Sequence, residues 1–168
     1  MEQIKRFEFV PGDEIVIAPG RTVKRVRALV AIAALGVSPG DLGGYVEKEG
    51  QVYGDAWVSG NARVYGNARV SGDARVYGDA WVYGCGLIFW ASIVGTENGT
   101  LTVYNGNDNT LLVTRGCFCG TVDEFLARSA DKHDERTRTE YRLLIDVARS
   151  RIEHARTVTA VPADEVAA

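Results

Sequence analysis

The middle of the chain alternates apolar and polar positions with a period of six residues. A valine recurs at every sixth position, followed two residues later by glycine and four residues later by alanine or, in the last unit, glycine. These valines are Val52, Val58, Val64, Val70, Val76 and Val82. A period of six fits neither a helix, with about 3.6 residues per turn, nor a meander of hairpins. The pattern predicts a stacked coil in which each unit forms one side.

The units resemble the hexapeptide repeats of left-handed parallel β-helices, in which three hexads make one triangular turn. This resemblance implies that the aliphatic and small positions, such as Val52 and Ala56, point inward. It is close over residues 52–87 and looser over residues 46–51 and 88–93. The left-handed coil fits the hexads best, and a short right-handed coil is the alternative.

Residues three hexads apart stack on one another in such a coil. The expected stacks are Trp57 beside Arg75, Arg63 beside Trp81, and Tyr65 beside Tyr83. With Arg69, these seven residues predict outer faces rich in arginine and aromatic rings. The stacks are interpreted either as cation–π ladders that hold the coils together or as a binding surface for a partner.

A short coil buries little and leaves open ends, so we expect caps at its ends or neighbouring subunits. Alternating apolar and basic positions over residues 23–30 predict a half-buried strand before the first coil. We therefore predict an α+β protein, in which residues 1–45 form an N-terminal β cap and residues 46–93 form the short parallel β-helix. Residues 94–156 form a C-terminal ββαα module, and residues 157–168 form a flexible tail.

The C-terminal module is predicted from turn and capping signals. Residues 101–104 and 110–113 flank an Asn/Gly-rich turn and indicate a hairpin. The pairs Thr121 with Glu124 and Thr137 with Glu140 have capping-box spacing, so each is expected to open a helix. One face of the longer helix carries Tyr141, Leu144, Ile145, Ala148 and Ile152, and this face must pack on the hairpin or on another subunit.

Composition excludes some classes of function. The 19 Lys and Arg residues stand against 22 Asp and Glu residues, for a net charge of −3, so no overall positive field exists for bulk nucleic-acid binding. The longest apolar run, residues 28–37, is half of the roughly 20 residues that a membrane span needs. The first residues lack the layout of a secretory signal, and three cysteines make a disulfide framework improbable. We expect a cytoplasmic protein.

In the order of its pieces the chain resembles a family of small bacteriophage and prophage proteins with hexapeptide repeats. The resemblance rests on the segment from Arg25 to Leu29, the segment Gly40 to Glu47, the repeats, and Gly116-Cys-Phe-Cys-Gly-Thr121. Proteins of this family are often described as polymer-forming or transferase-like, and their function is unsettled. The resemblance implies a phage origin, and hence the cytoplasm of an infected bacterial host.

Candidate chemistry is sparse. Acyl transfer in left-handed β-helices uses a histidine at the coil edge, whereas His133 and His154 lie outside the repeats. Cys117, ahead of a helix, with His133, is a candidate reactive thiol. Cys85, Cys117, Cys119 and His133 make an alternative zinc set, and buried inert cysteine is the commoner role. Stacked acids, Asp55 with Asp73 and Asp79 with Asn61, are interpreted as corner residues and not as a calcium site.

The preferred expectation is a non-catalytic phage accessory protein, without cofactor or metal, that binds a ligand or a host protein. Arginines and rings suit a phosphorylated nucleobase, so a nucleotide-like ligand and a role against host defence are hypotheses. We expect a homo-oligomer, preferably a trimer. The alternatives are a hexapeptide-type acyltransferase and a structural protein that forms filaments or part of a virion.

Overall fold

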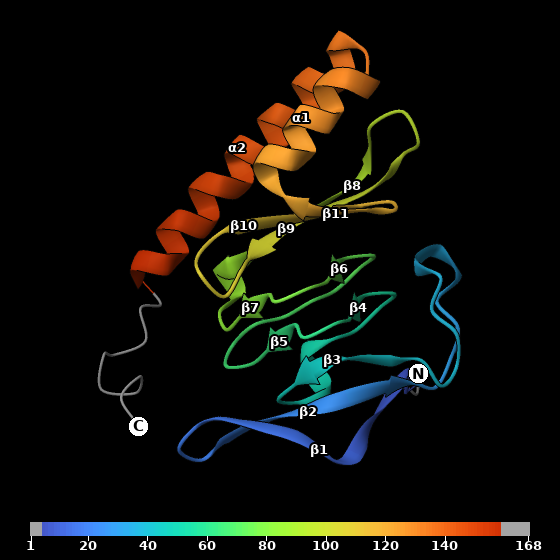
Figure 1. The fold of residues 1–168 in the computed structure, drawn as a ribbon, viewed down its shortest axis with the longest axis vertical. Coiled ribbons are helices and arrows are strands. Elements are labelled where there is room, and N and C mark those ends of the chain that lie inside the picture. Colours follow the sequence, from blue (N-terminus) through green and yellow to red (C-terminus); the bar gives the residue numbers. More distant parts are fainter. Residues whose placement is uncertain (1–4, 159–168) are drawn as a thin grey trace.

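Parallel pairing between residues 18 positions apart builds the middle of the chain. The computed structural model describes residues 5–158 and is drawn in Figure 1. Tyr45 pairs with Arg63 and Arg63 with Trp81, and a bridge joins Val52 to Val70. The strands of this stacked segment (residues 45–82) are β3 (Leu42–Val46), β4 (Trp57–Val58), β5 (Arg63–Val64), β6 (Arg75–Val76) and β7 (Trp81–Val82). The expected parallel strands, stacked at 18-residue spacing, are confirmed.

The core of the stacked segment consists of the repeated valines and alanines. Every repeat valine is at most 8% exposed, and so is every repeat alanine. These alanines are Ala56, Ala62, Ala68, Ala74 and Ala80. Small inward residues leave a narrow column of apolar contacts, so the segment depends on the structures that cover its two ends.

The N-terminal cap is an antiparallel hairpin that extends the parallel stack. Its strands are β1 (Phe7–Ala18) and β2 (Arg21–Ala28), and β2 pairs with β3. The resulting sheet has the order β1-β2-β3-β5-β7. In β2, Val23 and Val26 are buried while Lys24 is exposed, as a half-buried strand requires. A 3₁₀ turn, η1 (Ala33–Leu35), precedes β3.

The C-terminal part is a four-stranded antiparallel sheet with two helices on one face (Figure 1). Its elements are β8 (Ile88–Val94), β9 (Gly99–Asn105), β10 (Leu111–Arg115), β11 (Phe118–Thr121), α1 (Val122–Lys132) and α2 (Glu135–Val158), and the sheet order is β11-β10-β9-β8. A further 3₁₀ turn, η3 (Cys85–Leu87), leads from the stacked segment into β8. The expected hairpin of β9 and β10 is present, and β8 and β11 add a strand on either side of it. The sequence predicts residues 88–93 as the looser end of the repeats, whereas in the structure they belong to β8 of the antiparallel sheet.

The helices begin at different kinds of cap. Thr121 and Glu124 form the predicted capping box at the start of α1. Thr137 does not open α2, because the helix already begins at Glu135 and the backbone N–H of Thr137 donates to the Asp134 side chain at 2.9 Å. The predicted second capping box is therefore wrong, since an aspartate three residues upstream takes that role.

The predicted apolar face of α2 packs on the sheet. Tyr141, Ile145, Ala148 and Ile152 are each at most 2% exposed, and Leu144 is half-buried against the same core. Arg156 on this helix donates from Nε to Asn105 of β9 at 2.9 Å. The helix extends through Val158, and the rest of the predicted flexible tail lies outside the described residues. No helix within residues 5–158 combines the length and apolar character needed to cross a bilayer.

The sheet closes the last coil with one antiparallel bridge, Ala80 to Gly106, and with side chains. The Tyr104 hydroxyl donates to the Tyr77 carbonyl and accepts from the Tyr77 N–H, both at 3.2 Å. On Arg75, Thr102 accepts from the N–H at 3.2 Å and Thr114 donates to the carbonyl at 2.6 Å. Burial raises the pKa of Tyr104 far above its ordinary value, so the phenol keeps the proton that it donates. The open coil end thus has its backbone groups satisfied.

Replacing Gly66 by alanine should destabilise the protein more than the same change at Gly78. Both glycines have positive φ, at 64° and 77°, so each alanine costs about 1 kcal/mol in backbone strain. A Cβ on Gly66 would lie 2.5 Å from the Tyr83 carbonyl oxygen, whereas one on Gly78 meets nothing within 4 Å. We expect Gly66→Ala to lower the free energy of unfolding by roughly 1–3 kcal/mol more than Gly78→Ala in urea titrations. Equal losses would show that the coils are not packed at this spacing.

Candidate functional site

The predicted surface residues of the repeats lie in separate pairs on different sides of the stacked segment. The Arg63 guanidinium carbon lies 5.2 Å from the centroid of the Trp81 ring, and the rings of Tyr65 and Tyr83 are 5.7 Å apart. Arg75 pairs with Trp57 on another side. Arg69 is exposed next to Val70, which pairs with Val52 on the third side. Side-chain contacts therefore form between Arg63 and Trp81 and between Tyr65 and Tyr83, Trp57 and Arg75 are strand partners, and the pairs do not gather into one surface.

Trp57 is covered by the N-terminal part of the chain. The sequence placed this ring on an outer face, yet it is 3% exposed. A Cβ on Gly43 would lie 2.9 Å from Trp57 Cζ2, so the indole packs directly under this glycine of β3. The side chain therefore belongs to the core, and it is not available to a partner.

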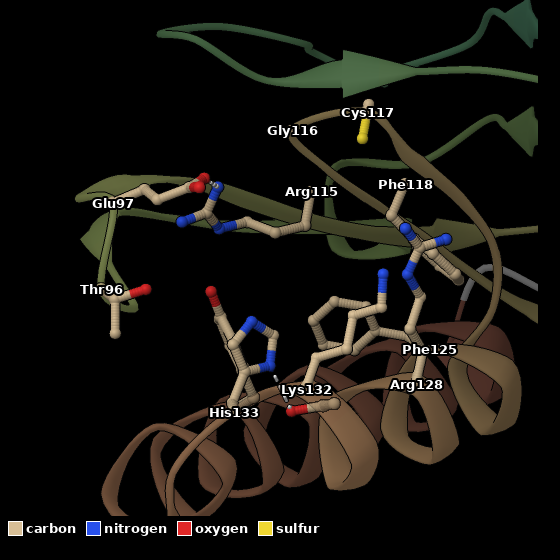
Figure 2. Close-up of a pocket in the computed structure, with 12 residues that line it drawn as sticks. Thr96, Glu97, Arg115, Gly116, Cys117, Phe118, Phe125, Arg128, Lys132 and His133 are labelled. Carbon is tan, nitrogen blue, oxygen red and sulfur yellow. Dashed lines mark hydrogen bonds and ion pairs between the residues drawn. The ribbon is translucent and has the colours of Figure 1, made fainter.

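A basic cavity lies where two turns of the antiparallel sheet meet α1. Its volume is about 170 Å³, and Figure 2 shows the residues that line it. The polar lining residues are Thr96, Glu97, Arg115, Cys117, Arg128, Ser129, Lys132 and His133. Arginine and lysine outnumber carboxylates by three to one, so the cavity is positively charged although the whole chain carries a net charge of −3. Such a lining favours an anion.

Two local structures bring the cations together. The β10–β11 turn consists of Gly116 and Cys117, and it places Arg115 at the end of β10 opposite Phe118. On α1, Arg128 and Lys132 are four residues apart and therefore on one face. Figure 2 shows their nitrogen ends reaching from the helix toward the cavity, while Arg115 enters from the sheet.

A row of rings forms the wall against the helices. Phe118 and Phe125 have centroids 5.3 Å apart, Phe125 and Tyr141 5.1 Å, and Tyr141 and His133 5.4 Å. Phe125 is 4% and Tyr141 2% exposed, so this wall is rigidly packed. The guanidinium of Arg128 lies 5.7 Å from the Phe118 ring, a cation–π contact that holds the arginine beside the cavity.

Arg115 is a buried cation with little to balance it. Its side chain is 10% exposed, and its Nη2 donates to the Val94 carbonyl at 3.0 Å. Its ion pair with Glu97 is long, at 3.8 Å, and the Glu97 side chain is 83% exposed. The Arg115 Nε is buried and has no hydrogen-bond partner within residues 5–158. A buried guanidinium normally has closer counter-charges, so an anion would complete this site.

The two members of the candidate thiol pair line the basic cavity without touching one another. Cys117 is exposed in the turn, and Figure 2 shows it across the cavity from His133. The His133 Nδ1 is 3.0 Å from the Ser129 hydroxyl, and its backbone N–H caps α1 by donating to the Ser129 carbonyl. A reactive Cys117 stays a prediction, and no hydrogen bond joins it to a base in the described part of the chain.

The other cysteines do not complete a metal site. Cys85 donates from Sγ to the Asn67 carbonyl at 2.6 Å, on the stacked segment. Burial raises the pKa of the Cys119 thiol more strongly than neighbouring Tyr104 and Arg75 lower it. Within the described part of the chain, no three His, Cys, Asp or Glu residues are grouped as metal ligands. The zinc and calcium alternatives thus find no support in the geometry.

Comparison with known proteins identifies the stacked segment. Residues 51–66, 56–70, 62–74 and 68–84 each match the family model described as YdcK beta solenoid repeat. The stacked segment is a β-solenoid repeat. No curated protein and no solved structure matches the chain. The matches cover the β-solenoid and not the sheet and helices that form the basic cavity.

The cations of the basic cavity were not among the residues predicted from the sequence. Arg128 and Lys132 could have been predicted to lie on one face of α1. The capping box at Thr121 fixes where the helix begins, and the two residues are four positions apart. Arg115 had no such signal, since its burial depends on β8 and α2, which are distant in sequence. Cys117 and His133 were singled out, and they do share this cavity with the cations.

Cys119 should react with Ellman's reagent more slowly than Cys117. Both thiols are exposed, so the difference comes from the raised pKa of Cys119, which leaves less thiolate at about pH 8. We expect a several-fold difference in rate between two variants, one that keeps only Cys117 and one that keeps only Cys119. His133→Gln in the Cys117-only variant should leave its rate unchanged, because the two side chains are not in contact. A rate that falls in this variant would restore the pair as a reactive site.

Proposed function

We propose that the protein is a non-catalytic binding protein whose basic cavity holds the phosphate group of a small molecule. The observation that carries this proposal is Arg115, a cation that is nine-tenths buried and whose one ion pair within residues 5–158 is with an exposed carboxylate 3.8 Å away. A phosphate oxygen would supply the missing counter-charge. Arg128 and Lys132 add cations on the opposite wall, as phosphate recognition requires.

A nucleotide-like ligand is consistent with the rings around the cavity. Phe118 and His133 are half-buried and line the basic cavity beside the cations. Guanidinium on phosphate and ring on base is a common combination in nucleotide recognition. The resemblance to phage and prophage proteins extends the proposal to a role in the cytoplasm of an infected bacterium. There the protein would sequester a phosphorylated signal of host defence or block a host protein.

The same proposal includes the finer form of the coil. We infer a left-handed parallel β-helix of hexapeptide repeats with three hexads per coil. This is supported by pairing at 18-residue spacing and by the six-residue recurrence of buried valines. It accounts for flat sides, on which Tyr53 and Tyr77 are exposed and around which a trimer would pack.

The alternatives have less support. A hexapeptide-type acyltransferase needs a histidine at a coil edge, and His133 and His154 lie on or beside the helices. End-to-end filaments need open coil ends, whereas β2 pairs along one end and β9 and β10 close the other. A closed oligomer is therefore favoured over a filament.

Arg128→Gln and Lys132→Gln should each weaken phosphate binding. Each removes one charge-assisted hydrogen bond, for which we expect a roughly tenfold rise in Kd for adenosine 5′-monophosphate or inorganic phosphate by calorimetry. Arg142→Gln is the control, because Arg142 is exposed on α2 outside the cavity and the charge change is the same. An equal loss in the control would contradict the proposal. It would also be contradicted if the unmodified protein binds no phosphate and mass spectrometry finds no phosphorylated molecule released from it.

Light scattering should give one mass that does not grow with protein concentration. We expect three times the chain mass of 18.2 kDa for the trimer, because both solenoid ends are covered and cannot add further copies. A mass that rises steadily with concentration would instead establish an open polymer. A constant mass of one or two chains would agree with covered coil ends and would contradict the trimer.

A further inference from the structure

A larger cavity lies on the other side of Arg115, at the junction of the β-solenoid and the antiparallel sheet. Its volume is about 340 Å³. The solenoid contributes Asp73 and Arg75, the sheet contributes Thr100, Thr102 and Thr114, and η1 closes one side with Ala34 and Leu35. We call it the junction cavity.

The junction cavity adjoins the basic cavity. Both are lined by Glu97, Arg115 and Gly116, so the Arg115 side chain stands at their boundary. At about 170 Å³, the basic cavity is smaller than the range of roughly 300–1,000 Å³ that small-molecule sites occupy. The junction cavity reaches that range by itself. A ligand with its phosphate in the basic cavity therefore has room for its body beyond Arg115.

Among the described residues, hydrogen-bonding groups form most of the lining of the junction cavity, and no aromatic ring lines it. The Thr102 hydroxyl accepts from the Arg75 N–H, which leaves its own proton free to donate. The Thr114 hydroxyl donates to the Arg75 carbonyl, which leaves its oxygen free to accept. Both threonines are at most 3% exposed, so they form the back of the cavity, and the accessible polar side chains of the lining include Asp73, Arg75 and Thr100.

Two charged side chains add to this set. Within residues 5–158, the Arg75 guanidinium has neither an ion pair nor a hydrogen bond, and its Nε is buried. Its guanidinium carbon lies 5.8 Å from the centroid of the Tyr77 ring. Asp73 is exposed at the rim and likewise has no ion pair in this part of the chain. A carboxylate and a guanidinium that line one cavity are suited to the hydroxyls of one ligand, the first as acceptor and the second as donor.

We propose that the ligand is a sugar phosphate, with its phosphate in the basic cavity and its hydroxyls in the junction cavity. Asp73 and Arg75 bind the hydroxyls, and Arg115 binds the phosphate from the boundary. This deepens the proposed function and rests on it. An aromatic phosphate has no ring to stack on in the junction cavity, so it gains nothing there.

Calorimetry with the full chain tests the sugar specificity. Ribose 5-phosphate should bind at least tenfold more tightly than inorganic phosphate, and phenyl phosphate should not share this gain. Asp73→Asn and Arg75→Gln should each reduce the advantage of ribose 5-phosphate about fivefold and leave the Kd for inorganic phosphate unchanged. Asp55→Asn is the matched control, because Asp55 is one coil earlier and outside the cavity, paired with Arg6.

The outcomes separate the two proposals. If inorganic phosphate binds and ribose 5-phosphate binds no tighter, or phenyl phosphate binds best, the sugar is overturned and phosphate binding stands. If none of the three binds, the proposed function itself is overturned. Asp73 is exposed, so its variant should fold even if Arg75→Gln does not, and thermal melting of each variant checks this. An unchanged sugar preference in a folded Asp73→Asn protein also rejects the proposal.

Discussion

The structure depends on satisfying the backbone groups at the two ends of a short β-solenoid. A stack of parallel strands leaves a row of N–H and C=O groups open at each end, and such edges either pair or aggregate. At the N-terminal end, β2 pairs with β3 and continues the sheet. At the other end, Tyr104, Thr102, Thr114 and Asn105 reach the last coil with their side chains. These polar residues are at most 3% exposed, and they are buried because they bind the backbone of the last coil.

Closing the coil also creates the candidate site. The sheet that covers the last coil ends in two turns, and the helices on its far face bring Arg128 and Lys132 to those turns. The junction cavity forms because the sheet meets the solenoid along β9 and β10 and leaves space beside η1. The solenoid itself supplies Asp73 and Arg75 to that space, and its other predicted ladder residues hold coils together. The proposed binding site thus lies in the cap and its junction and not on the sides of the coil.

The repeats were predictable because their signal is local and repeated. A valine every six residues identifies the inward positions, and the same period gives the partners of Arg63 and Trp81 without further information. The helix start at Thr121 was predictable for a similar reason, since a capping box needs only four residues. Thr137 and Glu140 have the same spacing, but here the Asp134 side chain caps the helix by accepting from the Thr137 N–H.

Features that depend on distant parts of the chain were not predictable. Nothing near Trp57 in sequence indicates that Gly43 packs over its ring, so an outer position by the repeat rule became a buried one. The strand β8 continues the chain directly after the last repeat, and it turns away because β9 pairs with it in antiparallel fashion. The basic cavity combines residues from β10 and α1, and only the folded arrangement of sheet and helix defines it.

A purely structural role explains Arg115 only in part. Its bond to the Val94 carbonyl ties β10 to β8, and its guanidinium lies 5.9 Å from the Tyr141 ring of α2. One such bond uses one of the five N–H groups of a guanidinium, and a neutral donor could make it without the cost of burying a charge, which is several kcal/mol. Glu97 offsets little of that cost, because it is mostly in water and exposed pairs contribute about 0–1 kcal/mol. A cation at this position is therefore best explained by a charge that arrives from outside the chain. The two cavities on either side of Arg115 are where such a ligand would lie.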